Sequence, residues 1–328
     1  MKILRKIIFL LFISLVFIQI GNAEIRKVAQ TGLQFLKIDM SARSAGMGGA
    51  YTMVGNDASA LFGNPAGISE MESNYDIFGS RVNWVADIYY SGAAAAAKLG
   101  NLGTVGLHFM TSEYGDIVGT RVADNEDGYI ETGNLDLDAY VVGVSYSRRL
   151  TNKFTLGGTV KFTSQHLGSN LMPSGETMTN EVSGLGYDFG TIFYPGFRSL
   201  RMGMSIRNFS PQFKYEETAF ELPLTFRIGF AMDVLDLMGG MNNHSLLVDV
   251  DAIHPRDYTE RIHVGGEYWY GDIIALRAGY KTNYDEQGLS LGFGLKYDIS
   301  GIDLKFNYAY SDFGALSNVN RITIGGAF

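Results

Sequence analysis

The sequence predicts an all-β protein, a transmembrane antiparallel β-barrel of about 14 strands with an N-terminal hatch or plug segment. Three observations carry this prediction. Most of the chain alternates apolar and polar residues with a period of two, as a strand with two different faces does. The composition combines 19 Tyr, 21 Phe and 41 Gly with no Cys. The connections alternate between long and short, as in bacterial transmembrane barrels.

The first 23 residues are typical of a secretory signal peptide. A basic start from Lys2 to Lys6 is followed by an apolar run from Ile7 to Ile20 and by small residues from Gly21 to Ala23. The apolar run is too short for a helix that spans a bilayer. We therefore expect an exported protein whose mature chain begins at Glu24.

Residues 24–73 do not alternate and form the predicted hatch. Their centre, SARSAGMGGAYTMVGNDASALFGNPAG, is rich in Gly, Ala and Ser. Glycine allows close approach to a barrel wall and left-handed backbone conformations. Because the complete G-x-G-x-x-G phosphate pattern is absent, we expect a structural role for these glycines rather than a ligand-binding one.

One short helix is expected within the hatch. Asn56 or Asp57 can cap a helix from Ala58 to Phe62, because a side-chain oxygen at that position accepts from a free backbone N–H. Pro65 is expected to stop the helix, since the residue before a proline disfavours the helical region.

Residues 74–328 carry the predicted barrel. In GLSLGFGLKY, residues 288–297, every second side chain is Leu, Phe or Tyr and the others are Ser, Gly or Lys. Segments of this kind are about nine or ten residues long, which is the length that a tilted strand needs to cross a bilayer. They are centred near residues 75, 90, 105, 140, 158, 188, 204, 228, 249, 265, 277, 293, 306 and 324.

The connections predict which end of the barrel faces which compartment. Long polar connections lie at 114–134, 165–183, 210–223 and 281–287, and short ones at 100–103, 150–153, 271–272 and 300–301. Short turns belong to the periplasmic side of such barrels, so we expect both termini there. The connection at 234–244 is long but falls on the short side, and it is the exception to this scheme.

A soluble β-sandwich would also alternate, with the apolar face as its core. Two features favour the barrel. Tyrosines gather at segment ends, as at Tyr89-Tyr90 and Tyr268 to Tyr270, where an interfacial aromatic girdle would lie. The chain also ends on an aromatic residue, Phe328, which we expect to act as the assembly signal of the last strand.

The polar face of the predicted strands would line the lumen, and it carries charges of both signs on neighbouring segments. One interpretation is a charged, selective pore. The other, which we favour, is a structural set of cross-strand ion pairs in a filled barrel. The lumen-facing residues on which this depends are Arg201, Arg207, Arg227, Asp249, Asp251, His263, Glu267 and Arg277.

Several classes of function are disfavoured. A net charge of −8 without basic runs argues against nucleic-acid binding. The histidines have no zinc-site spacing, and the acidic loop at 124–128 lacks the spacing of an EF-hand. Ser290 sits in a G-x-S-x-G match but inside an uninterrupted strand pattern, which lacks the sharp turn that a nucleophile elbow requires. We expect no enzyme, no metal and no cofactor.

Some of these segments resemble a known family. Asn64, Pro65, Ala66 and Gly67 are similar to the hatch motif of FadL-like outer-membrane barrels. FLKIDMSARSAGMGGAY and DASALFGNPAGIS more closely resemble the PorV/PorQ family, as do LPLTFRIGFA and YAYSDFGALSNVNRITIGGAF further along. The resemblance therefore covers nearly the whole of the expected mature chain.

This resemblance implies a fourteen-stranded barrel with a hatch in the outer membrane. It also implies a link to type IX secretion, as a shuttle or accessory whose outer loops and rim bind secreted cargo or secretion components. Outer-membrane lipid and the barrel assembly machinery are the other implied partners. FadL itself implies the alternative, passive uptake of hydrophobic small molecules. The charged lumen favours the first function over the second.

Overall fold

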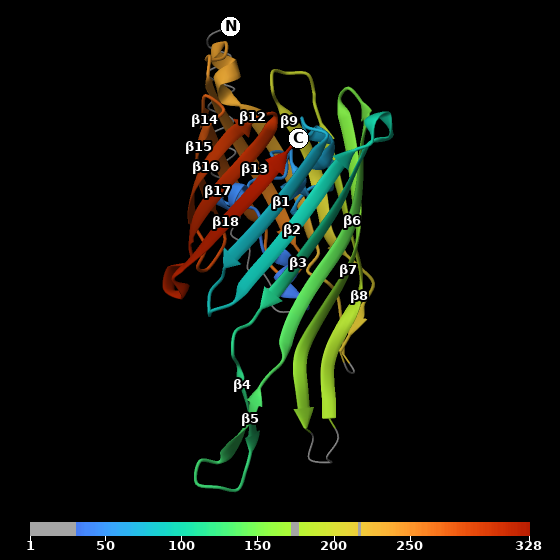
Figure 1. Cartoon of the computed structure of the whole chain (residues 1–328), viewed down its shortest axis with the longest axis vertical. Coiled ribbons are helices and arrows are strands. Elements are labelled where there is room, and N and C mark those ends of the chain that lie inside the picture. The colour runs from blue at the N-terminus through green and yellow to red at the C-terminus, as the bar shows by residue number, and fades with distance from the viewer. Residues whose placement is uncertain (1–30, 172–176, 216–217) are drawn as a thin grey trace.

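Fourteen antiparallel strands close into one barrel in the computed structural model, which describes residues 31–171, 177–215 and 218–328 (Figure 1). This confirms the predicted fold and strand number. The predicted signal peptide and the start at Glu24 lie outside the described residues. The strands of the wall are β1 (Tyr75–Asn83), β2 (Tyr89–Lys98), β3 (Thr104–Glu113), β6 (Leu137–Thr151), β7 (Phe154–Leu171), β8 (Thr177–Phe193), β9 (Arg201–Phe209), β12 (Thr225–Asp233), β13 (His244–Pro255), β14 (Arg261–Tyr270), β15 (Ile274–Lys281), β16 (Leu289–Ile299), β17 (Ile302–Asp312) and β18 (Asn318–Ala327).

The barrel closes where β1 pairs with β18. The ladder runs from Asp76 opposite Ala327 to Asn83 opposite Asn320. Phe328 extends it, because its N–H donates to the carbonyl of Tyr75 (3.0 Å) and its carbonyl accepts from the N–H of Tyr75 (2.8 Å). The two aromatic rings also stack, with centroids 5.4 Å apart.

The outer face of the wall is apolar, as the alternation predicts. Side chains such as Leu291 and Ile324 are 48% and 62% exposed, while their polar sequence neighbours point inward. This pattern suits a barrel in lipid. Within the described ranges, no helix is long and apolar enough to cross a membrane.

The two ends of the barrel differ in their connections. The short-turn end carries the beginning of β1, the end of β18 and the tight turns, together with η4 (Gly100–Leu102) and η5 (Val234–Met238). The long-loop end carries a projecting hairpin of β4 (Val118–Val122) and β5 (Tyr129–Asn134), the small hairpin of β10 (Phe213–Lys214) and β11 (Ala219–Phe220), and η6 (Gly314–Leu316).

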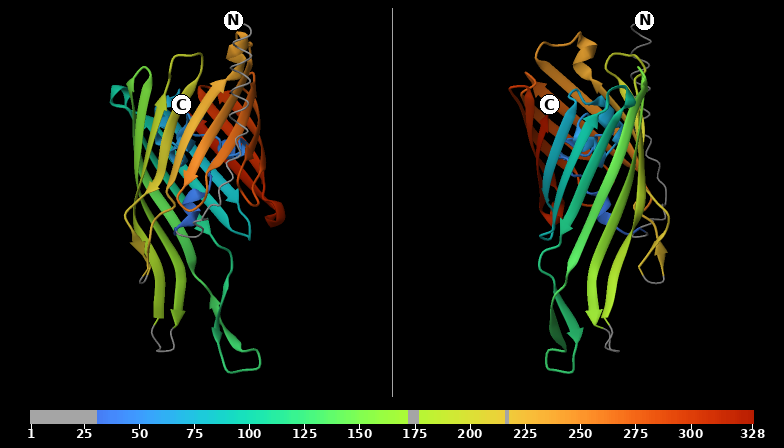
Figure 2. Two further views of the ribbon diagram at one scale, coloured as in Figure 1. Left: turned by 180° about the vertical axis from the view of Figure 1, so that it is seen from behind. Right: turned by 45° about the vertical axis from the view of Figure 1, so that its right-hand side comes forward.

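The predicted long loop at 165–183 is mostly strand instead. β7 and β8 stay paired out to Leu171 opposite Thr177, with one register shift between His166 and Ser169. The two strands therefore project beyond the rest of the wall, as Figure 2 shows from both sides. Thr177, Thr179 and Val182 are β-branched and suit a strand, which the polarity of the segment concealed.

The described part of the predicted hatch, residues 31–73, lies inside the barrel (Figure 1). Its helices are η1 (Gln34–Lys37), α2 (Ala42–Gly46), η2 (Ala58–Phe62) and η3 (Pro65–Glu70). As predicted, a helix spans Ala58 to Phe62, and Asp57 caps it by accepting from the N–H of Ser59 (3.0 Å). The helix ends before Pro65, as expected, and the preceding residue Asn64 is extended (φ −118°, ψ 106°). Pro65 also opens η3, where its missing N–H would have no helical partner.

Candidate functional site

The backbone of the hatch touches the wall where α2 and the turn after it meet β14, β15 and β16. A Cβ at Gly279 would overlap the backbone of Met47 and Gly48, and one at Gly265 would overlap the carbonyl of Met47. A Cβ at Gly292 would lie 2.9 Å from the Cα of Gly46. Glycine is required at these wall positions because the two backbones touch there.

A buried charge network joins the same regions. The Glu267 carboxylate is 1% exposed and accepts from Nε and Nη2 of Arg43 in the hatch (2.8 and 2.7 Å). It also accepts from Nε of Arg277 on the neighbouring strand (2.6 Å). One buried acid thus holds two guanidinium groups. Its removal would leave Arg277 buried without an acid and would leave Arg43 with Asn56 (2.7 Å) and the more distant Asp57 (4.0 Å).

A second polar contact lies where the hatch passes β12 and β13. The fully buried Asp251 carboxylate accepts from the N–H groups of Tyr51 and Thr52 (both 3.1 Å) and from the hydroxyl of Thr52 (2.7 Å). Arg227 lies 3.8 Å from the same carboxylate and donates to the carbonyl of Gly49 (3.1 Å). Asp251 and Arg227 of the wall therefore bind backbone groups of the hatch.

The other lumen-facing residues take several positions. Asp249 is buried two residues before Asp251, on the same face of β13. Arg207 is half-buried and donates to the carbonyl of Leu36 (3.2 Å), and Arg201 is half-buried on β9. His263 is buried, with its Nε2 2.9 Å from the hydroxyl of Tyr284.

The predicted hatch motif, Asn64 to Gly67, packs against β7 and β8. The Asn64 side chain caps η3 by accepting from the N–H of Ala66 (3.1 Å) and donates to the carbonyls of Thr52 (3.0 Å) and Thr191 (3.3 Å). A Cβ at Gly157 or Gly190 in the wall would overlap the motif. In the described chain, these contacts of the motif join it to the hatch and to the wall.

The last turn of η3 is anchored at the short-turn end. Glu70 accepts from Nη2 of Arg149 (2.5 Å), the hydroxyl of Thr155 (2.9 Å) and the hydroxyl of Tyr194 (2.7 Å). Burial, and then the adjacent Glu70 carboxylate, raise the pKa of Tyr194 to about 12. Tyr194 is therefore a neutral donor at any physiological pH.

Sequence reasoning missed the partners of three cationic side chains in the lumen. Arg321 donates to the carbonyl of Asp39 in the hatch (2.9 Å). Lys305 donates to Asp76 (2.7 Å) and lies 3.9 Å from Asp57. Buried Lys161 donates to Asp188 (2.7 Å) and to Asn208 (2.6 Å). Each charge stands on the polar face of its segment, so alternation identifies it, but only the fold supplies the partner.

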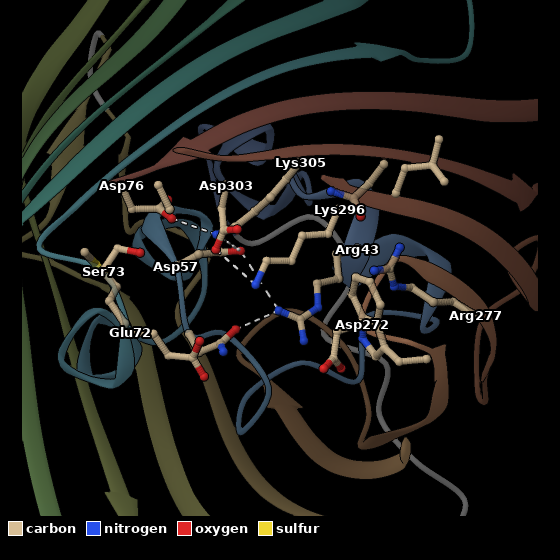
Figure 3. Close-up of a pocket in the computed structure, with 16 residues that line it drawn as sticks. Arg43, Asp57, Glu72, Ser73, Asp76, Asp272, Arg277, Lys296, Asp303 and Lys305 are labelled. Carbon is tan, nitrogen blue, oxygen red and sulfur yellow. Dashed lines mark hydrogen bonds and ion pairs between the residues drawn. The ribbon is translucent and has the colours of Figure 1, made fainter. Parts of the chain in front are cut away.

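A polar cavity of about 260 Å³ opens at the short-turn end (Figure 3). Arg43, Lys296 and Lys305 line it together with acids from the hatch and from β1 and β17. Burial alone would raise the pKa of Asp57, but the charges of Lys305 and Arg43 outweigh it and hold that pKa below its usual range. The lining is mixed in charge and suits water and polar groups rather than a hydrophobic ligand.

No group of acidic or histidine side chains that could hold a metal occurs among the described residues. Ser290, in the G-x-S-x-G match, is buried in β16 and donates to the hydroxyl of Ser311 (3.2 Å), so no base faces it there. The hatch fills the lumen and packs on the wall through a buried apolar cluster, which includes Leu36, Leu61 and Met110. The charges described above add polar contacts to this docking.

The comparisons with known proteins give this arrangement a family. The model of the type IX secretion system protein PorV matches residues 21–252. The chain belongs to the PorV family. This confirms the family that the hatch segments indicated. The PorV match spans the hatch and the wall as far as β13. No curated protein matches the chain.

Solved structures place the PorV-family fold among FadL-like outer-membrane barrels. The CymD monoaromatic hydrocarbon channel is 14% identical, with a TM-score of 0.55 over 91% of this chain and 99% of that one. The Ralstonia pickettii toluene transporter TbuX is 15% identical, with a TM-score of 0.53 over 87% and 96%. A Pseudomonas aeruginosa FadL homologue is 12% identical, with a TM-score of 0.54 over 88% and 98%. The protein is an outer-membrane barrel, and its family and neighbours are secretion proteins and channels rather than enzymes.

Proposed function

We propose that this barrel serves type IX secretion as a shuttle or accessory that binds protein partners at its long-loop end. The match to the PorV model carries the proposal. We place the short-turn end, with Phe328, toward the periplasm and the long loops toward the cell exterior. The N-terminus lies outside the described residues, and Gly32 lies at the long-loop end, where its N–H donates to the carbonyl of Glu221 (3.2 Å). We propose no catalytic role and no cofactor.

The geometry of the hatch supports protein binding over conduction. Its backbone is held to the wall by Asp251, Arg227 and Arg321, and its charged side chain Arg43 is held by Glu267. A passage for hydrophobic molecules needs an apolar path past the hatch, whereas the cavity at the short-turn end is lined by charges. The predicted lumen charges then act as docking groups for the hatch.

The projecting surfaces at the long-loop end are suited to recognition. The β4–β5 hairpin carries exposed apolar side chains, among them Val122 (89% exposed), Val118 and Ile130. Loops and hairpins on a rigid barrel are where binding residues tend to sit. An apolar hairpin that extends beyond the barrel suits contact with another protein.

The alternative is passive transport of hydrophobic small molecules. Two structural neighbours are described as a toluene transporter and a monoaromatic hydrocarbon channel, which supports this function for a related fold. The sequence identities of 14% and 15% bear on the fold alone, so the alternative ranks second.

The experiment is purification of the tagged protein from its native outer membrane in mild detergent, with protein and lipid analysis of the same eluate. Leu135 donates to the carbonyl of Ile117 (2.8 Å) at the base of the β4–β5 hairpin, so an Asn-Gly turn can replace residues 118–134 without disturbing the wall. A matched control shortens η5, at the opposite end.

We expect exported proteins to co-purify with the native chain and with the η5 control, and less with the hairpin variant. A bound hydrophobic molecule without protein partners would overturn the proposal in favour of transport. Equal recovery of the same proteins with both variants would exclude the hairpin while leaving the secretion role in place.

A further inference from the structure

The pairing between β8 and β9 covers only part of β8 and ends before its long-loop end. The two strands pair from Phe193 opposite Met202 to Tyr187 opposite Phe209, with a register shift between Tyr187 and Phe189. Asn208 adopts a left-handed backbone (φ 61°). Its N–H donates to the Asp188 carboxylate (2.7 Å) and its side chain donates to the carbonyl of Pro223 (3.1 Å). These contacts turn the chain out of the wall directly after β9.

The chain after β9 turns inward instead of continuing beside β8. Phe213 is 6% exposed and packs on the face of Gly184, where a Cβ would lie 2.5 Å from its ring. The hydroxyl of Tyr215 donates to the Gln165 side chain of β7 (2.9 Å). The segment Pro211–Lys214 therefore covers the lumen and leaves the edge of β8 without a neighbouring strand.

The part of β8 beyond this point is paired on one side only. Residues 181–186 pair with residues 161–166 of β7, and in the described chain no strand pairs with them from the other side. The stretch is about 20 Å long at roughly 3.3 Å per residue. Its side chains alternate, with Glu181, Ser183 and Leu185 exposed on the outer face.

A comparison with β18 shows which way the N–H and C=O groups of residues 181–186 of β8 point. Residues of a strand direct N–H and C=O to alternate neighbours. On β18 the outward-facing Phe328 directs both groups to Tyr75 of the following strand. β8 and β18 run in the same direction, because the antiparallel order puts an odd number of strands between them. The outward-facing Glu181, Ser183 and Leu185 accordingly direct their N–H and C=O groups to the side of β8 that no strand occupies in the described chain.

An open cleft lies beside this edge. Its volume is about 310 Å³, and it is lined by Glu181–Leu185 on one side and by Pro211–Lys214 on the other. A row of free N–H and C=O groups next to such a cleft is complementary to one type of ligand, an extended polypeptide that adds a strand to the sheet.

We propose that the edge of β8 at residues 181–186 binds an extended segment of an exported partner protein by strand addition. This inference rests on the proposed secretion function, since it names the part of the partner and the surface that holds it. Cross-strand pairing favours a segment with an apolar side chain beside Leu185 and a cationic one beside Glu181.

The test uses Ser183, whose side chain is exposed and whose N–H faces the cleft. Ser183→Pro removes that donor, and its matched control Ser183→Ala keeps the backbone intact. Both variants are purified from the native outer membrane, and the exported proteins in each eluate are quantified. Loss of one edge hydrogen bond predicts about three- to tenfold less partner with Ser183→Pro, while heat-modifiable barrel is equally abundant.

A second measurement identifies the bound segment. The chain has no Cys, so Ser183→Cys gives a single attachment site for a benzophenone photocrosslinker. We expect crosslinks to one short contiguous segment of an exported protein. Crosslinks to β8 of a second copy would overturn the proposal and indicate edge-to-edge dimers. This measurement also decides the matter if Ser183→Pro does not assemble.

The outcomes separate the two proposals. Equal recovery of exported proteins with Ser183→Pro and Ser183→Ala, both assembled, would overturn strand addition and leave the secretion function standing. Absence of any exported protein from the Ser183→Ala eluate and from the crosslinks would overturn both.

Discussion

The two faces of the wall at β14, β15 and β16 follow one alternating pattern but are stabilised in different ways. The outer side chains, such as Val264, Leu276 and Leu291, are exposed to the surroundings and need only be apolar. The inner positions, Glu267 and Gly279, contact particular atoms of the hatch. Tolerance of substitution should therefore depend on chemical class outside and on the individual partner inside.

The largest expected effect is on the inner face. Glu267→Gln leaves Arg277 buried without an acid and removes the nearer acid of Arg43, and breaking a buried ion pair in this way costs about 3–5 kcal/mol. We expect protease to cut the hatch readily in this variant. Asp303→Asn is the control, because its pair with Lys296 (3.0 Å) is partly exposed and worth under about 1 kcal/mol. Similar sensitivity in both variants would contradict the comparison.

The outer face is tested by Leu291→Arg. An arginine that faces lipid costs about 2–4 kcal/mol at the bilayer midplane and less toward the interfaces. Leu291 is the third residue of β16, so we expect a reduced amount of heat-modifiable protein in the outer membrane. Leu291→Ile should assemble normally, because it stays apolar. Normal insertion of Leu291→Arg would mean that this face does not meet lipid.

Two glycines sharpen the comparison between faces. Gly279→Ala places a methyl group against Met47 and should destabilise the docked hatch by about 1–3 kcal/mol. Gly266→Ala, one strand away, meets only the Leu247 carbonyl at 3.9 Å and should be tolerated. Denaturant unfolding with a hatch-specific probe measures both. A hatch equally stable in the two variants would show that the close approach at Gly279 is dispensable.

The outer face also includes the seam at Phe328. Deletion of Phe328 removes two backbone hydrogen bonds to Tyr75 and a ring stack, together about 2 kcal/mol. We expect a reduced yield of assembled barrel, with Phe328→Tyr as a control that keeps the aromatic ring. Equal yields of folded protein with and without Phe328 would refute its role as an assembly signal.

The smallest effect is on pH dependence. Burial opposes ionisation of Asp257, but hydrogen bonds from Lys37, Gln34 and Thr31 of the hatch hold its pKa below the usual range. A lowered pKa stabilises the folded state above the ordinary Asp value of about 3.9, and this stabilisation is lost as the pH falls through the folded-state value. Hatch protection should therefore weaken in acid, and less so in Asp257→Asn. An unchanged acid profile in the variant would exclude this group.

Alternation predicted the strands of the wall and their outer faces. Segments such as 288–297 predicted both a strand and its outer face. When one face meets lipid, only one of the two possible orientations of an alternating strand places its apolar side chains there. The hatch was also predicted from its lack of that period. Residue pattern was sufficient for these features because each depends on short stretches of sequence.

The partners in the lumen were beyond sequence reasoning. Arg43 and Glu267 are 224 residues apart, and nothing local links them. Ion pairs between neighbouring strands were expected, and the Glu267–Arg277 and Lys161–Asp188 pairs match this expectation. The contacts that Asp251 and Arg227 also make with the hatch backbone were not foreseen. The turn at Asn208 depends on a register shift that no periodicity reveals.

The closure of the barrel has a consequence for how the protein folds. Arg321 of β18 donates to the carbonyl of Asp39 across 282 residues of sequence, and β1 waits for β18 to complete its ladder. Contacts of such long range bring a large loop-closure entropy and slow the approach to the native state. The hatch is synthesised before the wall, but its contact with Arg321 can form only after the last strand is present.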